Sequence, residues 1–120
     1  MTQVSWNYSF HNLISPIIAA LFAGDAIIVK PSELVAWSSQ HFARAIRDCL
    51  AAHGHNPDIV QVIIAGEKEA AEALTGDERI QALTFIGSEG VGRQVAARAG
   101  AAGTQVTLEL GGKVRADPNP

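Results

Sequence analysis

Apolar residues recur along this chain in blocks that alternate between helical and strand spacing. Helical spacing predicts helices over residues 10–23, 36–52, 68–74 and 88–100. Short and nearly continuous apolar runs predict strands over residues 26–29, 59–65, 82–86 and 104–110. Such alternation, with strands too uniformly apolar to face water, predicts an α/β fold with a mostly parallel sheet and helices on both of its faces.

Chemically useful residues cluster where these predicted strands end, which is where sheets of this kind bind ligands. Lys30, Gly66, Gly87-Ser88 and the segment 109–112 all fall there. Glu109 is unusual, because it lies between Leu108 and Leu110 in a strand, where glutamate is depleted. The pattern alone leaves two readings, a functional carboxylate or an edge-strand glutamate that faces solvent before a glycine turn.

Composition narrows the classes of protein. The 120 residues suffice for one small domain or part of one, and 48% hydrophobic residues, 18% charged residues and a net charge of −3 describe an ordinary globular segment. No basic patch suggests a nucleic-acid partner. The longest apolar stretch, residues 13–23, is shorter than the roughly 20 residues that cross a bilayer.

The single cysteine excludes an internal disulfide framework, so we expect a reducing, cytoplasmic location for this chain. Cys49 falls at helical spacing with apolar residues, which predicts a small core residue. The four histidines show no metal-ligand spacing, so no metal is predicted.

Three further segments carry weak signals of their own. Lys30-Pro31-Ser32-Glu33 holds an ammonium and a carboxylate at one corner, which suits a sugar hydroxyl and equally a solvated surface ion pair. Residues 85–92 read as a strand, a glycine turn and a helix start, where backbone N–H groups can receive a phosphate or Ser88 can simply cap the helix. Asn7 alone reads as a turn residue.

Taken together and in order, Ser5-Trp6-Asn7-Tyr8, Lys30–Glu33, Phe85–Ser88 with Val91-Gly92, and Glu109–Lys113 resemble the aldehyde dehydrogenase superfamily. The segments 36–40 and 60–62 resemble its fungal and plant branch of membrane-associated enzymes. The resemblance implies a partial, Rossmann-like NAD-binding domain over residues 1–113 and a polar tail outside the family pattern over residues 114–120. The full-length form would oxidise a small-molecule aldehyde to a carboxylic acid, with homo-oligomers and membrane association allowed.

The resemblance also implies roles for individual residues. Glu109 would be the general base that activates water, and Asn7 would donate its amide to the substrate oxygen. Lys30 and Glu33 would bind the adenosine ribose, with a carboxylate that repels a 2′-phosphate and so favours NAD over NADP. Gly87 and Ser88 would contact the pyrophosphate, and Val91 the adenine region. The cofactor-binding residues implied are Trp6, Lys30, Ser32, Glu33, Gly66, Gly87, Ser88, Val91, Leu110 and Gly111.

Several positions depart from the family pattern. Ile86 stands where threonine is usual, and Ser5 and Ser9 stand where prolines are common. The family's nucleophilic cysteine is expected several tens of residues beyond Glu109, and this chain has no cysteine there. Three readings therefore stay open: a segment of an aldehyde dehydrogenase, a noncatalytic nucleotide-binding or regulatory chain, and a gene fragment without a stable fold.

Overall fold

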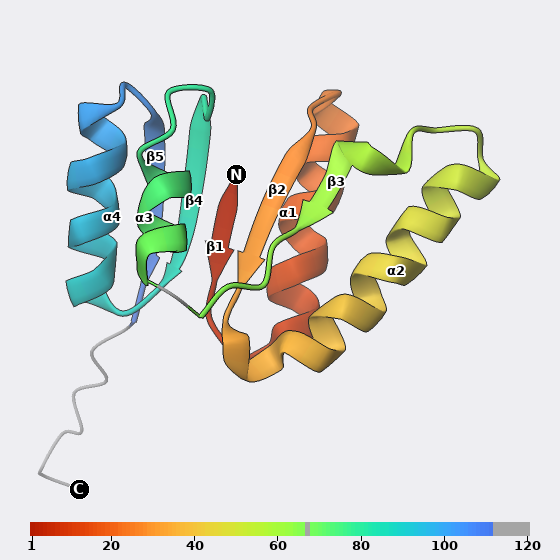
Figure 1. The fold of residues 1–120 in the computed structure, drawn as a ribbon, viewed down its shortest axis with the longest axis horizontal. Coiled ribbons are helices and arrows are strands. Elements are labelled where there is room, and N and C mark those ends of the chain that lie inside the picture. Colours follow the sequence, from red (N-terminus) through yellow and green to blue (C-terminus); the bar gives the residue numbers. More distant parts are fainter. Residues whose placement is uncertain (67, 112–120) are drawn as a thin grey trace, which may run out of the picture.

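The computed structural model describes residues 1–66 and 68–111, which form one five-stranded sheet in the order β3-β2-β1-β4-β5. Every neighbouring pair of strands is parallel, so the five arrows of Figure 1 run in one general direction. The strands are β1 (Thr2–Val4), β2 (Ile27–Pro31), β3 (Val60–Val62), β4 (Ala82–Gly87) and β5 (Gln105–Leu110). This confirms the predicted α/β class with a parallel sheet.

The helices follow the predicted blocks closely. They are α1 (Ser9–Ala23), α2 (Ala36–Ala52), α3 (Lys68–Thr75) and α4 (Glu89–Ala101), with the short 3-10 turns η1 (Glu33–Val35) and η2 (Pro57–Ile59). The sequence did not predict β1, because three residues are too few to show a period of two, yet β1 lies at the centre of the sheet. Strand β3 is shorter than predicted: the Ile63 N–H still donates to the Val29 carbonyl oxygen, and the chain then leaves the sheet.

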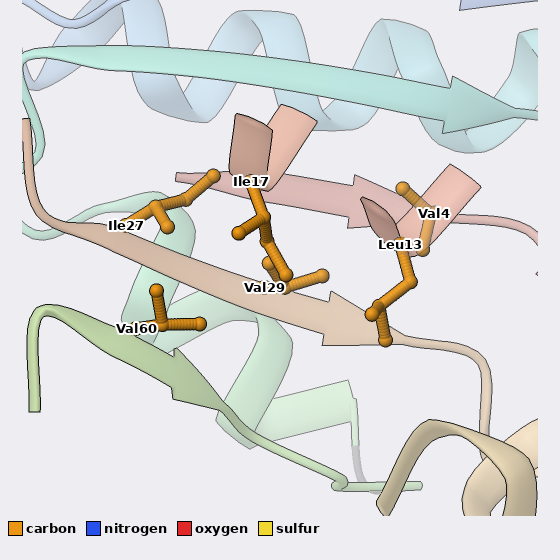
Figure 2. Packing of buried hydrophobic residues seen from close by; sticks show 6 residues of the cluster. All are labelled: Val4, Leu13, Ile17, Ile27, Val29 and Val60. Atoms are coloured by element: carbon orange, nitrogen blue, oxygen red, sulfur yellow. The ribbon is translucent and has the colours of Figure 1, made fainter. Parts of the chain in front are cut away.

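The first hydrophobic core lies between α1 and the strands β1, β2 and β3. Leu13 and Ile17 of α1 are fully buried, and they point at the apolar side chains of these strands (Figure 2). Three aromatic and aliphatic residues of α2 pack against the same cluster, so α2 covers this face beside α1. The buried members are Val4, Leu13, Ile17, Ile27, Val29 and Val60.

A second core lies on the opposite face of the sheet, over β4 and β5. Thr84 pairs with Thr2, which pairs with Val29, and paired residues of parallel strands share a face. Leu83 and Phe85 alternate with Thr84, so they point away from the first core, and they pack against α4. Helices therefore cover both faces, as predicted: α1 and α2 over one half of the sheet, α4 over the other (Figure 1).

The prediction that Cys49 is a core residue was wrong. Its side chain is exposed near the end of α2. Helix α2 turns Ser39 and Ala43 inward, and Phe42 and Ile46 complete the contact with the first core. Helical spacing alone does not show how wide the buried face of α2 is, and Cys49 lies outside that face.

No helix in the described part of the chain is long and apolar enough to span a membrane. Gly112, Lys113 and the predicted tail over residues 114–120 lie outside the described residues.

Candidate functional site

The carboxyl ends of β1, β2, β4 and β5 meet at one edge of the sheet. The connection that leaves β1 leads to β2 on one side, and the connection that leaves the adjacent β4 leads to β5 on the other side. Ligands of open parallel sheets bind at such a switch point. Strands β1 and β2 stay paired up to this edge: Val4 pairs with Pro31, and the Ser32 N–H donates to the Val4 carbonyl oxygen at 3.1 Å.

Asn7 lies in the loop that follows β1, and its side chain is exposed at this edge. The Ser5 hydroxyl donates to Asn7 Oδ1 at 2.5 Å. Because the amide oxygen accepts this bond, the Asn7 Nδ2 hydrogens are the part of the amide left to serve as donors. Trp6 is 62% exposed beside it, so the loop presents an aromatic surface and an amide donor to solvent.

Lys30, Ser32 and Glu33 form the corner that follows β2. The Ser32 hydroxyl accepts a hydrogen bond from the Leu34 N–H at 3.3 Å and so caps η1, while Glu33 is exposed. Gly66 lies beside this corner: a Cβ on it would be 3.8 Å from Glu33 Cβ and Cγ. In the described ranges, no ion pair joins Lys30 to Glu33, so the surface-ion-pair reading of this motif is not what the structure shows.

Gly87 ends β4 under the ring of Phe85. A Cβ on Gly87 would lie 2.6 Å from Phe85 Cζ, which is closer than real Cβ atoms approach. The same ring borders Gly92 of α4, where a Cβ would meet Phe85 at 3.3 Å and Leu110 Cδ2 at 2.5 Å. Both glycines are therefore needed for packing around one buried ring, in addition to any contact with a phosphate.

Helix α4 begins at this edge with its backbone donors uncapped. Ser88 is the N-cap residue, yet its side chain makes no capping hydrogen bond, and its carbonyl oxygen accepts the first helical bond from Gly92 at 2.9 Å. The N–H groups of the first turn are left for solvent or an anion. Glu89 is acidic in that turn, but Arg93 pairs with it at 2.6 Å. Val91 is 49% exposed on the same turn.

Glu109 lies on the opposite face of β5 from Leu108 and Leu110. Leu108 packs against the second core, and Leu110 reaches towards Gly92. Glu109 instead pairs with Ile86, whose side chain packs against the first core. The side chain of the unusual isoleucine therefore lies on the same face of the sheet as Glu109, although Ile86 directly precedes Gly87 in the chain.

Glu109 and Ile86 line a broad groove that runs between α1 and the uncovered half of this face. Its volume is about 1220 Å³, and Asn12, Ser15 and Thr84 also line it. The groove continues around the opposite edge of the sheet, past Asp25 and Asp77. Of the residues with predicted roles, Glu109 alone belongs to it among those described, so the base and the predicted cofactor residues face different spaces.

Two groups at the opposite edge of the sheet have a lowered pKa. The Arg79 guanidinium donates to Asp77 and lowers the pKa of that carboxyl from 3.8 to about 2. Burial lowers the pKa of the Met1 ammonium, which donates to the Ala82 carbonyl oxygen at 2.8 Å. Both groups lie where β1 and β4 begin. Among the described residues, no three His, Cys, Asp or Glu side chains come together as metal ligands.

Sequence reasoning missed Asn12 of α1. It is 8% exposed and donates from Nδ2 to the Asn7 carbonyl oxygen at 2.8 Å and to Ser5 Oγ at 3.3 Å. A polar residue on the buried stripe of an apolar helix, next to Leu13, was the available signal. Gly111 is exposed directly after β5, and a Cβ on it would meet no described atom within 4 Å.

Comparisons with known proteins find similar sequences and a similar fold. The chain is 48% identical over 110 residues to an aldehyde dehydrogenase-like protein of Schizosaccharomyces pombe. This match covers 92% of the chain and 21% of the relative. It is 38% identical over 109 residues to the dimeric NADP-preferring aldehyde dehydrogenase of Mus musculus, and this match covers 91% of the chain and 22% of the relative. The crystal structure of Mycobacterium tuberculosis aldehyde dehydrogenase complexed with NAD⁺ matches at a TM-score of 0.82 and 34% identity. This match covers 93% of the chain and 22% of that structure's chain.

The chain thus spans about a fifth of the length of the curated relatives it matches. The model of the aldehyde dehydrogenase family matches residues 3–116, nearly the whole sequence. These matches confirm the family resemblance seen in the four motifs: the chain belongs to the aldehyde dehydrogenase family.

Proposed function

We propose that this chain is the cofactor-binding segment of an NAD-dependent aldehyde dehydrogenase. The observation that carries the proposal is the uncapped first turn of α4 beside Gly87 and Ser88, at the switch point of the sheet. A helix start without a side-chain cap leaves backbone donors for an anionic group, such as a pyrophosphate. Pairing of Glu89 with Arg93 supports this role, because it offsets the one acidic group of that turn.

The residues at this edge fit a dinucleotide. Lys30 and Glu33 present a donor and an acceptor for ribose hydroxyls. Gly66 lies beside Glu33, and its lack of a side chain leaves its backbone accessible there. Ser88 and the first turn of α4 would hold the pyrophosphate, and the exposed Val91 would support the adenine. Trp6, Ser32, Leu110 and Gly111 border the same edge from β1, β2 and β5. When bound, NAD supplies a hydride acceptor for oxidation of the substrate carbon.

The two predicted catalytic residues would have separate roles, one towards the substrate and one towards water. Asn7 keeps its Nδ2 hydrogens available and would donate to a substrate oxygen as negative charge develops there. Glu109 would accept a proton from water on the groove side of β5. The one cysteine, Cys49, lies near the end of α2, at the edge of the sheet opposite to Glu109. We therefore expect no aldehyde turnover from this chain alone.

Preference for NAD over NADP is the finer part of the proposal. The exposed carboxylate of Glu33 would lie near a 2′-phosphate and repel it, without a pairing partner to neutralise it among the described residues. Both cofactors occur among similar proteins: one relative is called NADP-preferring, and one structural neighbour is complexed with NAD⁺.

Titration calorimetry of the purified chain with NAD⁺ and NADP⁺ tests both parts. We expect measurable NAD⁺ binding, weaker NADP⁺ binding, and a smaller difference between the two in Glu33→Gln. The matched control is Glu78→Gln, which removes the same charge from an exposed residue at the other edge of the sheet and should leave the ratio unchanged. No binding of either nucleotide by a cooperatively folded chain would refute the proposal.

The remaining properties belong to the whole protein. We propose a small-molecule aldehyde as substrate and a homo-oligomeric full-length form, because the chain belongs to the aldehyde dehydrogenase family. The cytoplasmic location of this chain and membrane association of the full-length form stay predictions, and fractionation of cells that express both would test them.

A further inference from the structure

Asn12 directs all of its described donors into the loop that carries Asn7. Its Nδ2 donates to the Asn7 carbonyl oxygen at 2.8 Å and to Ser5 Oγ at 3.3 Å, and its backbone N–H donates to the Tyr8 carbonyl oxygen at 2.9 Å. The side chain is 8% exposed, while Asn7 and Tyr8 are exposed. The buried Asn12 side chain is thus hydrogen-bonded to the loop of residues 5–8.

The loop needs such a hold, because Tyr8 adopts the left-handed conformation. Its φ of 51° and ψ of 44° are rarely adopted by residues with a bulky side chain. The Tyr8 side chain is 79% exposed, so its own packing does not enforce that conformation. Strained backbone persists only where its surroundings determine it. Here the Tyr8 carbonyl accepts the first backbone bond of α1, and Asn12 Nδ2 binds the carbonyl of the preceding residue, Asn7.

The side-chain bonds run in one direction, from Asn12 through Ser5 to Asn7. A backbone carbonyl only accepts, so the Asn12 atom against the Asn7 carbonyl must be the amide nitrogen. That nitrogen donates to Ser5 Oγ as well, and the Ser5 hydroxyl in turn donates to Asn7 Oδ1. In this arrangement the Asn7 Nδ2 hydrogens remain available as donors.

We propose that Asn12 is a positioning residue for Asn7, acting through Ser5 and the backbone of the loop. This rests on the proposed role of Asn7 as a donor to the substrate oxygen. Asn12 touches no substrate, and its part is to present the donor end of the Asn7 amide rather than the acceptor end. A proline, which is common at position 5 in the family, would make the loop rigid by its ring. Ser5 instead links Asn12 to Asn7 through two hydrogen bonds.

Nitrogen-15 relaxation of the Asn7 side-chain amide in the full 120-residue chain tests the inference without any cofactor. We expect the order parameter of its N–H bonds to be near the rigid value of about 0.85, and to fall below about 0.6 in Asn12→Asp. The carboxylate has nearly the same shape, but it cannot donate and would lie against the Asn7 carbonyl. Ser5→Ala should have the same effect, because it removes the relay and leaves the bond from Asn12 to the backbone.

The control is Asn56→Ala, which removes a similar side-chain bond, from the Asp58 N–H to Asn56 Oδ1 at 2.9 Å, in a distant turn. It should leave the Asn7 amide unchanged even if it lowers stability. If Asn12→Asp does not fold, Ser5→Ala decides. An Asn7 amide that is mobile in the unaltered chain, or equally ordered in the folded variants, overturns the proposal. Calorimetry with NAD⁺ reports separately on the proposed function.

Discussion

Replacing Gly87 by alanine should destabilise the chain through the ring of Phe85. The new Cβ would lie 2.6 Å from Phe85 Cζ and 3.0 Å from Cε1, so the ring must move. Phe85 is 6% exposed and packs with Leu83 and Val95 in the second core, so little room exists for that movement. Overpacking of this kind costs about 1–3 kcal/mol, and the lower backbone entropy of unfolded alanine returns about 0.5–1 kcal/mol.

The net loss expected for Gly87→Ala is therefore about 0–2.5 kcal/mol. A chain of this length unfolds with an entropy that makes 1 kcal/mol worth about 4 °C, so the midpoint should fall by up to about 10 °C. Urea unfolding followed by circular dichroism checks the free energy, and an unchanged urea slope shows that the denatured state is the same.

Gly66→Ala is the matched control for this substitution, at the same edge of the sheet. Its Cβ would meet Glu33 carbons at 3.8 Å, an ordinary contact, so we expect no loss and a gain of up to about 1 kcal/mol. If Gly87→Ala is as stable as Gly66→Ala, the steric reasoning fails, and a need for glycine at position 87 would have to come from the ligand alone.

Further measurements address the acid end of the pH range and the first core. Asp77 should titrate by NMR with a pKa of about 2, and in Arg79→Ala its pKa should return towards 3.8. Because the folded pKa is lowered, the stability from this group is present above pH 3.8 and is lost as the pH falls towards about 2; an unaltered pKa in Arg79→Ala would contradict this. Leu13→Ala should cost about 2–5 kcal/mol in urea unfolding, since Leu13 is fully buried, whereas Phe22→Ala, at a side chain that is 90% exposed, should cost little; equal losses would refute the assigned core.

The fold could be predicted from the sequence because each block is long enough to show its own period. Helix α2 begins and ends where helical spacing placed it, at Ala36 and Ala52. Strand β1 could not be predicted, because Thr2, Gln3 and Val4 become a central strand only through pairing with β2 and β4. Its place is set by contacts distant in sequence, which local periodicity does not report.

The edge of the sheet could be predicted for a different reason. The carboxyl ends of parallel strands lie together, so Lys30, Gly87 and Glu109 reach one edge without any knowledge of the loops. The role of Asn12 could not be predicted, because it depends on a loop conformation in which Tyr8 has a positive φ. The need for glycine at Gly87 likewise depends on where the Phe85 ring lies.

Alternation along β5 separates the two proposed activities of this edge. Glu109 shares a face with Ile86 and looks into the groove beside α1, where Asn12 also lies. Leu110 points the other way, to α4 and the proposed pyrophosphate site. Because the side-chain period of a strand is two, the proposed base and the residue beside the proposed cofactor site lie on opposite faces of β5. A register slip of one residue against β4 would exchange these faces, so the proposed function depends on the pairing of Ile86 with Glu109 and of Gly87 with Leu110.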